Sequence, residues 1–155
     1  MKKFIALVAL LCTVMISSTA MAANWVLIGS SEYYTIYVDN DSIRRDYNYS
    51  GYVFRAVIKW IFTDAGRKRV IEQIRLKGQP LPKMIYKLSD SVALYYFKSG
   101  DAVNYSDVLV TVYHTREGYS IPELEGSHSE PQWSIIPPGT ISEIIFDAVY
   151  ARVPN

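Results

Sequence analysis

The sequence has very few of the residues on which enzymes most often depend. Its 155 residues include one cysteine, Cys12, and two histidines, His114 and His128. It has no Gly-x-Ser-x-Gly, no His-Glu-x-x-His and no phosphate-binding loop. Catalysis needs a nucleophile, an acid–base pair or a metal, and each requires particular side chains brought together. We therefore expect no catalytic residues, no cofactor and no metal. An enzyme that uses His114 or His128 stays open as an alternative.

One acidic cluster has part of the spacing of a calcium site. Asp39 and Asp41 are placed like the first two ligands of an EF-hand loop. The third ligand position is Ile43, however, and no glycine follows where that loop requires one. The segment Asp39-Asn-Asp-Ser42 therefore predicts a turn in which short polar side chains bond the local backbone.

The first 22 residues predict a secretory signal peptide. Lys2 and Lys3 form its charged region, residues 4–16 its apolar region, and Ala20-Met21-Ala22 its cleavage site. The apolar run of 13 residues is short of the roughly 20 that a membrane-spanning helix needs. We expect cleavage after Ala22, and a product in the periplasm, at the cell surface or secreted.

Lipid attachment at Cys12 is an alternative that the flanking residues do not favour. The preceding residue is Leu11 rather than a small one, and the apolar run continues past Cys12. Residues 23–155 then form one domain of ordinary size without any cysteine. This domain must be stable without disulfides although it enters an oxidising compartment.

Alternation of side chains predicts a sheet through most of this domain. The longest alternating stretch, Tyr52 to Thr63, has an even-numbered face that is wholly apolar or aromatic and a mixed odd-numbered face. We expect a central strand there, with its even face on the core. Asp64-Ala-Gly66 is predicted to be the hairpin turn that follows it. Further strands are expected at 25–29, 33–38, 67–77, 84–88, 92–97 and 108–114.

Several segments are predicted to interrupt the sheet, among them Gly78-Gln-Pro-Leu-Pro82. Ser89-Asp90-Ser91 separates the strands expected at 84–88 and 92–97. Residues 115–131 are rich in glycine, proline and acidic residues, so we expect a mobile surface loop without fixed structure.

Residues 141–150 predict the one helix of the domain. Thr140 and Glu143 have capping-box spacing, and Pro137 with Pro138 prevents an earlier start. Apolar residues recur there with a 3.6-residue period, namely Ile141, Ile144, Ile145, Ala148 and Val149. A helix of about three turns is marginal alone in water. The predicted fold is therefore α+β: an antiparallel sheet of about six strands with a C-terminal α-helix packed on one face.

The charges gather in the middle of the domain. Residues 55–87 include nine basic and two acidic residues, a net of +7, while the flanking segments are acidic. The candidate binding site lies there and consists of Arg67, Lys68, Arg69, Arg75 and Lys77, with Lys83 nearby. Such charges on a hairpin tip would attract sulfated glycans, acidic proteins or lipid headgroups. Alternatively, they only protect a strand edge from pairing. Nucleic acid is not expected for an exported domain with a net charge of −1.

The tyrosines leave two interpretations open. Thirteen are present, and Tyr rings can stack on sugars or anchor a protein partner. Cross-strand packing explains the rings without a ligand, and is the favoured interpretation, for those in or near predicted strands, which are Tyr33, Tyr34, Tyr37, Tyr47, Tyr49, Tyr95 and Tyr96.

The order of several short motifs resembles the surface-adhesin protein E family of secreted bacterial proteins. The chain has an opening Trp25, then Tyr37-Val-Asp39 with Ser42-Ile43, a middle that ends in Tyr95-Tyr96 and Gly100, and Trp133-x-x-Ile-Pro-Pro-Gly-Thr140 before the terminal helix. The resemblance implies a sheet of about six strands with the helix on its concave face. It also implies a non-enzymatic role at the cell surface, in which host matrix or plasma proteins are bound.

Two features depart from that family. Members commonly join the helix to the sheet through a disulfide, for which this domain has no cysteine, and the segment 115–131 has no match. We expect a binding protein for a protein or anionic glycan partner. The alternative is a periplasmic structural or assembly protein that pairs its sheet edges with an envelope partner or with itself, as a homodimer.

Overall fold

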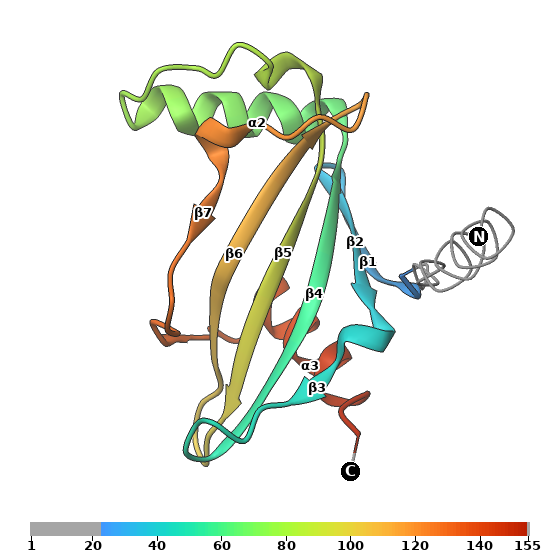
Figure 1. Cartoon of the computed structure of the whole chain (residues 1–155), viewed down its shortest axis with the longest axis vertical. Coiled ribbons are helices and arrows are strands. Elements are labelled where there is room, and N and C mark those ends of the chain that lie inside the picture. The colour runs from blue at the N-terminus through green and yellow to red at the C-terminus, as the bar shows by residue number, and fades with distance from the viewer. Residues whose placement is uncertain (1–22, 155) are drawn as a thin grey trace, which may run out of the picture.

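A computed structural model describes residues 23–154, which form one antiparallel sheet with two α-helices (Figure 1). The predicted signal peptide lies outside the described residues. The sheet order is β1-β2-β4-β5-β6-β7, with β3 paired to β4 and β8 to β6. The strands are β1 (Trp25–Ser30), β2 (Tyr34–Asp39), β3 (Arg44–Arg45), β4 (Tyr52–Phe62), β5 (Leu88–Ser99), β6 (Tyr105–Thr115), β7 (Gly126–Ser127) and β8 (Ser134–Ile135). The helices are α2 (Asp64–Leu76) and α3 (Ile141–Tyr150), with short 3₁₀ turns η1 (Asn40–Ser42), η2 (Ile85–Lys87) and η3 (Pro122–Leu124). The predicted α+β architecture is confirmed.

Strand β4 is central and its even face is on the core, as its alternation predicts. Phe54, Ala56 and Ile58 are fully buried in the main core cluster. Phe54 stacks on Phe97 of β5 at 5.3 Å between ring centroids, and Phe146 of α3 lies 5.4 Å from Phe54. The C-terminal helix therefore covers this face of the sheet.

Helix α3 begins at the predicted cap and buries most of the predicted stripe. The Thr140 hydroxyl accepts from the Glu143 backbone amide at 3.4 Å, and the Glu143 carboxylate accepts from the Gly139 amide at 2.7 Å. Ile145 and Val149 are buried as predicted. Ile144, however, is 50% exposed, and Phe146 takes its place in the core at 3% exposed. The prediction was wrong about Ile144 because the helix is rotated toward the aromatic cluster of β4 and β5.

The structure has a helix at 64–76, where the sequence predicted a hairpin turn and a strand. Asp64-Ala-Gly66 is the first turn of α2 and not a hairpin turn, and the strand predicted at 67–77 does not exist. Thr63 caps the helix, since its hydroxyl accepts from the Gly66 amide at 3.1 Å. Ile71 and Ile74 are buried one turn apart in a second core cluster with Ile85, Leu88 and Ile121.

The C-terminus of α2 ends in a Schellman motif. The Gly78 amide donates to the Arg75 carbonyl at 2.9 Å, and the Gln79 amide donates to the Ile74 carbonyl at 3.2 Å. Gly78 has a φ of +66°, which favours glycine. Thr63 and Gly78 thus mark both ends of a helix that the alternation of Ile74 and Leu76 with basic residues concealed.

Strand β5 begins four residues before the strand predicted at 92–97 and ends two residues after it. The strand expected at 84–88 is replaced by η2, with Ile85 fully buried, and β5 begins at Leu88. Ser89-Asp90-Ser91 does not interrupt it. These small polar residues are part of the strand: Asp90 pairs with His114 of β6, and Ser91 pairs with Tyr113.

Residues 115–131 have more structure than the predicted loop. They include η3 and β7, which pairs with Val110 and Thr111 of β6. Ile121 is fully buried in the second cluster and donates its amide to the Tyr113 carbonyl at 2.8 Å. Apolar anchors among glycines and prolines fix this segment. None of the described helices is long and apolar enough to cross a membrane.

Candidate functional site

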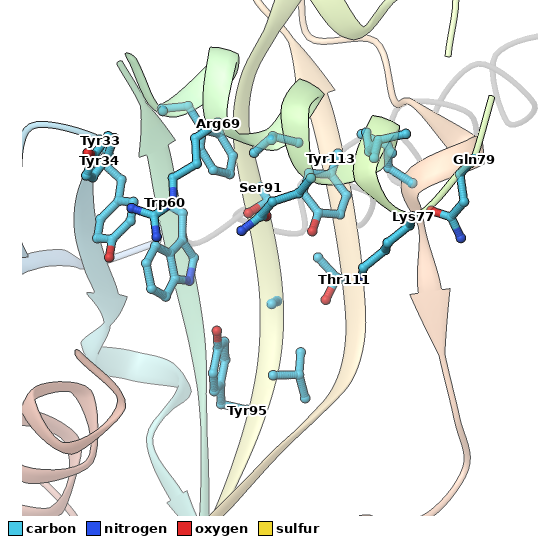
Figure 2. A pocket seen from close by; sticks show the side chains of 18 residues that line it. Tyr33, Tyr34, Trp60, Arg69, Lys77, Gln79, Ser91, Tyr95, Thr111 and Tyr113 are labelled. Atoms are coloured by element: carbon cyan, nitrogen blue, oxygen red, sulfur yellow. The ribbon is translucent and has the colours of Figure 1, made fainter. Parts of the chain in front are cut away.

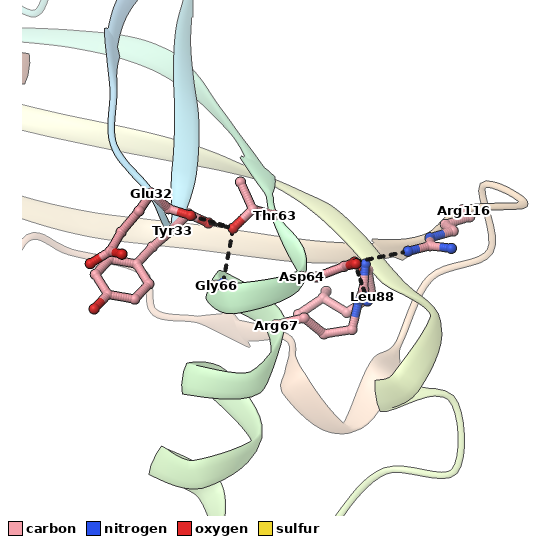
Figure 3. A network of polar contacts seen from close by, with 8 residues as sticks. All are labelled: Glu32, Tyr33, Thr63, Asp64, Gly66, Arg67, Leu88 and Arg116. Atoms are coloured by element: carbon pink, nitrogen blue, oxygen red, sulfur yellow. Dashed lines mark hydrogen bonds and ion pairs between the residues drawn. The ribbon is translucent and has the colours of Figure 1, made fainter.

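The five basic residues predicted as a binding site all belong to α2 or its C-terminus, but they point in different directions. Arg67 is the most enclosed, with 13% of its side chain exposed. Its Nε donates to the Leu88 carbonyl at 2.7 Å, and its guanidinium pairs with Asp64 at 2.9 Å (Figure 3). Arg116 joins the same Asp64 carboxylate at 3.3 Å. Arg67 therefore fixes α2 to the start of β5 and has few donors left for a partner.

Lys68 and Arg75 lie on one side of α2. Together with Tyr86 they line a cavity of about 590 Å³ that also touches Asp64, Arg67, Ile71 and Glu72. Both cations are exposed, and neither forms an ion pair within residues 23–154. We call Lys68 and Arg75 the outer pair. Glu72 partly offsets their charge.

Arg69 and Lys77 lie on the side of α2 that faces the sheet. They line a different cavity of about 580 Å³ between the helix and strands β4 to β6 (Figure 2). The Arg69 guanidinium lies 4.7 Å from the centroid of the Tyr33 ring. Neither cation forms an ion pair within the described part of the chain. We call Arg69 and Lys77 the inner pair.

The floor of this α2–sheet cavity is the same face of the sheet that α3 covers further along. Register places Trp60 of β4, Ser91 of β5 and Tyr113 of β6 side by side, and Ala93 beside Thr111. A bulge between β5 and β6 at Leu94/Tyr95 turns Val108 onto this face as well. Trp60 and Phe54 share the even face of β4, so α2 and α3 use two parts of one surface.

Aromatic rings and uncharged polar groups dominate the lining. Six rings contribute, from Tyr33, Tyr34, Trp60, Phe62, Tyr95 and Tyr113. Tyr34 packs edge-on against Trp60 at 4.7 Å between centroids. The polar atoms come from tyrosines, Ser91, Thr111, Gln73 and Gln79, and the only charges are those of the inner pair. No aspartate or glutamate lines the cavity.

Burial raises the pKa of two phenols on the floor. It raises the pKa of Tyr95 to about 12, against the opposing effect of the neighbouring Trp60, and it raises the pKa of Tyr113 as well. At the rim, the adjacent Glu32 raises the pKa of Tyr33 and Arg69 lowers it. The Tyr95 and Tyr113 hydroxyls, which would be neutral at pH 7 even with an ordinary pKa of about 10, stay protonated to still higher pH.

Both histidines lie outside this cavity. His114 Nδ1 is 3.0 Å from the Asp90 carboxylate, on the opposite face of the sheet, and Lys59 is 3.9 Å from the same carboxylate. His128 Nε2 contacts the Asp107 carboxylate, which also accepts from the Gln132 amide at 2.9 Å. These contacts join β5 to β6 and hold residues 128–132 against β6.

The side chains of the acidic turn at 39–42 form hydrogen bonds with the local backbone. Asp39 accepts from the Asn24 and Asp41 amides at 3.0 and 3.2 Å, as its turn chemistry predicts. Within residues 23–154, no three side chains of His, Cys, Asp and Glu come together as a metal would require.

The sequence predicted the inner pair but not the surface that it faces. Tyr33, Tyr34 and Tyr95 line the cavity, whereas Tyr49 and Tyr96 pack edge-on with each other beneath Trp133 on the opposite face. The sequence does indicate part of this surface, because the apolar and aromatic series at the even positions of β4 continues past Ile58 to Trp60 and Phe62. Without α2 in place, nothing marked where the core ends and the cavity begins.

Comparison with family models, with curated proteins and with solved structures finds no match to this chain.

Proposed function

We propose that this chain is an exported, non-catalytic binding protein that recognises an acidic protein or a sulfated glycan through the outer pair on α2. The motif resemblance to surface-adhesin E proteins supports such a role at the cell surface or in the periplasm. So does the scarcity of histidine and cysteine in the sequence.

The observation that carries the proposal is the pair of exposed cations beside a shallow cavity. Lys68 and Arg75 lie two turns apart along the helix with Tyr86 next to them. An aromatic ring beside two unpaired cations offers a partner both apolar contact and charge. Part of the charge has a simpler use, because basic residues in the last turn stabilise the helix dipole. That effect applies to Arg75 and does not explain Lys68.

The test compares two double variants that remove equal charge from α2. Lys68→Ala/Arg75→Ala removes the outer pair, and Arg69→Ala/Lys77→Ala removes the inner pair. Both should be measured for binding to immobilised heparin at several salt concentrations. We expect the outer-pair variant to lose at least tenfold in affinity and the inner-pair variant to lose less than threefold. Equal losses would show that heparin affinity depends only on the net charge of α2. Undiminished binding by the outer-pair variant would contradict the proposed site.

The proposed location needs its own experiment. Antibody labelling of intact cells should be compared with labelling of cells whose envelope has been opened. Labelling of intact cells would support surface adhesion. Labelling of opened cells alone would move the search to periplasmic partners, including the assembly role kept as an alternative.

A further inference from the structure

The residues that line the α2–sheet cavity have no part in the binding proposed for the outer pair. The cavity has a volume of about 580 Å³, within the roughly 300–1,000 Å³ of small-molecule sites. It lies beneath the helix, while Lys68 and Arg75 line a separate cavity. The two sites can therefore be tested independently.

The polar groups of this cavity are free to bind a ligand. Within residues 23–154, no protein group forms a hydrogen bond with the side chains of Ser91, Thr111 or Tyr113, or with those of Lys77 and Gln79. Ser91 is only 4% exposed, and its hydroxyl is not among the atoms sealed off from solvent. These groups are open to solvent, so a ligand that displaces water from them must offer hydrogen bonds of its own.

The charged residues that line the cavity have one sign. Arg69 and Lys77 stand at its helical wall, no carboxylate lines it, and Glu32 lies at the rim beside Tyr33, so the field inside favours an anion. The walls remain aromatic elsewhere, with Trp60 and Tyr95 on the floor. Figure 2 shows Arg69 above Trp60 and Lys77 near Thr111, so that a ligand on the floor would have a cation near each end.

We propose that this cavity binds a short acidic saccharide, with the sugar rings on Trp60 and the neighbouring tyrosines, their hydroxyls on Ser91, Thr111 and Tyr113, and the acid groups on Arg69 and Lys77. The C–H face of a pyranose ring packs on an aromatic ring, while its rim offers hydroxyls to polar side chains. A fatty acid would match the cations and the rings. It would leave the hydroxyls of Ser91, Thr111 and Tyr113 without partners, which a site of this kind penalises.

The binding test uses two acidic probes and their neutral counterparts, and it leaves out heparin, which reports on the outer pair. Trigalacturonate and a sialylated lactose are titrated calorimetrically into the protein. The carboxyl-reduced trisaccharide and lactose serve as controls. We expect at least one acidic probe to bind ten times more tightly than its neutral form, and the affinity to fall as salt is added. Quenching of Trp60 fluorescence, lost in Trp60→Phe, would locate the probe.

The same two double variants separate this proposal from the previous one. Removal of the inner pair should weaken the best acidic probe at least tenfold, and removal of the outer pair less than twofold. Thr111→Val, which keeps the shape of the side chain and removes its hydroxyl, should weaken binding by about twofold to tenfold. This variant keeps the proposal testable if loss of Arg69 from the Tyr33 ring disturbs folding.

Three results would overturn the inference. The first is that none of the acidic probes binds at about 10 mM. The second is that a neutral counterpart binds as tightly as its acid. The third is that dodecanoate or benzoate displaces the best saccharide at lower concentration, which would assign the cavity to a lipid or an aromatic acid.

Discussion

Gly66 lies so close to the Tyr33 carbonyl that a β-carbon at position 66 would stand 1.9 Å from its oxygen. The contact joins the first turn of α2 to the chain just before β2. Since real β-carbons do not approach a backbone atom this closely, Gly66→Ala must move the helix or the β1–β2 connection. We expect a loss of about 1–3 kcal/mol in the free energy of unfolding, measured with urea. Gly126→Ala is the control, because nothing lies within 4 Å of its β-carbon. Equal stability of the two variants would contradict the close approach.

The Thr63 hydroxyl caps α2 and also donates to the Glu32 carbonyl at 2.6 Å (Figure 3). Thr63→Ala removes both bonds and should cost about 0.5–2 kcal/mol of stability. Thr63→Ser keeps the hydroxyl and should lose much less. If the serine variant unfolds as early as the alanine variant, the methyl group matters and the cap does not.

Ile145 and Ile144 are neighbours on α3 with opposite exposure, 1% and 50%. Ile145→Ala should cost about 2–5 kcal/mol, and Ile145→Asp should detach the helix because it buries a charge without a partner. Ile144→Asp should leave the melting temperature nearly unchanged. Thermal unfolding of the matched pair checks this, and similar melting temperatures would show that α3 is not held by this stripe.

Stability should fall at alkaline pH through Tyr95. Its pKa is about 12 in the folded protein, against about 10 in an unfolded chain. The folded state therefore keeps the proton longer, and the stabilisation is complete below about pH 10 and lost as pH rises toward about 12. The difference corresponds to about 3 kcal/mol. Urea unfolding at pH 8 to 11.5 should show a steeper decline for the wild type than for Tyr95→Phe. Parallel declines would mean that Tyr95 ionises normally.

The sequence predicted the parts of this fold in which local pattern and tertiary packing agree. The even face of β4 and the Thr140 cap of α3 are of this kind. It failed at α2, where Ile74 and Leu76 alternate with basic residues as in a strand while Thr63 and Gly78 mark a helix. Two valid local signals conflicted, and burial of Ile71 and Ile74 against Leu88 decided between them.

Of the candidate site, the sequence predicted the cations but not the surface that they face. Counting charges locates Arg69 and Lys77, but only the helical period sends them to one side of α2 and Lys68 with Arg75 to the other. The facing surface depends on Trp60, Ser91 and Tyr113 being adjacent across three strands. The register depends on the pairing of all the strands, so it cannot be predicted from the sequence of any one segment.

The bulge between β5 and β6 gives this sheet an unusual tolerance. A one-residue deletion inside a strand normally inverts every side chain on one side of the change. Val108 pairs with Tyr95 and Val110 with Leu94, so Leu109 has no opposite residue. A gene that lost the Leu109 codon would encode a strand whose pairing could close without inversion. The cost would be the packing of one leucine and its carbonyl bond from the His128 amide. Deletion of Leu109 is therefore a one-residue change within β6 that would leave Val108, Thr111 and Tyr113 on the cavity floor.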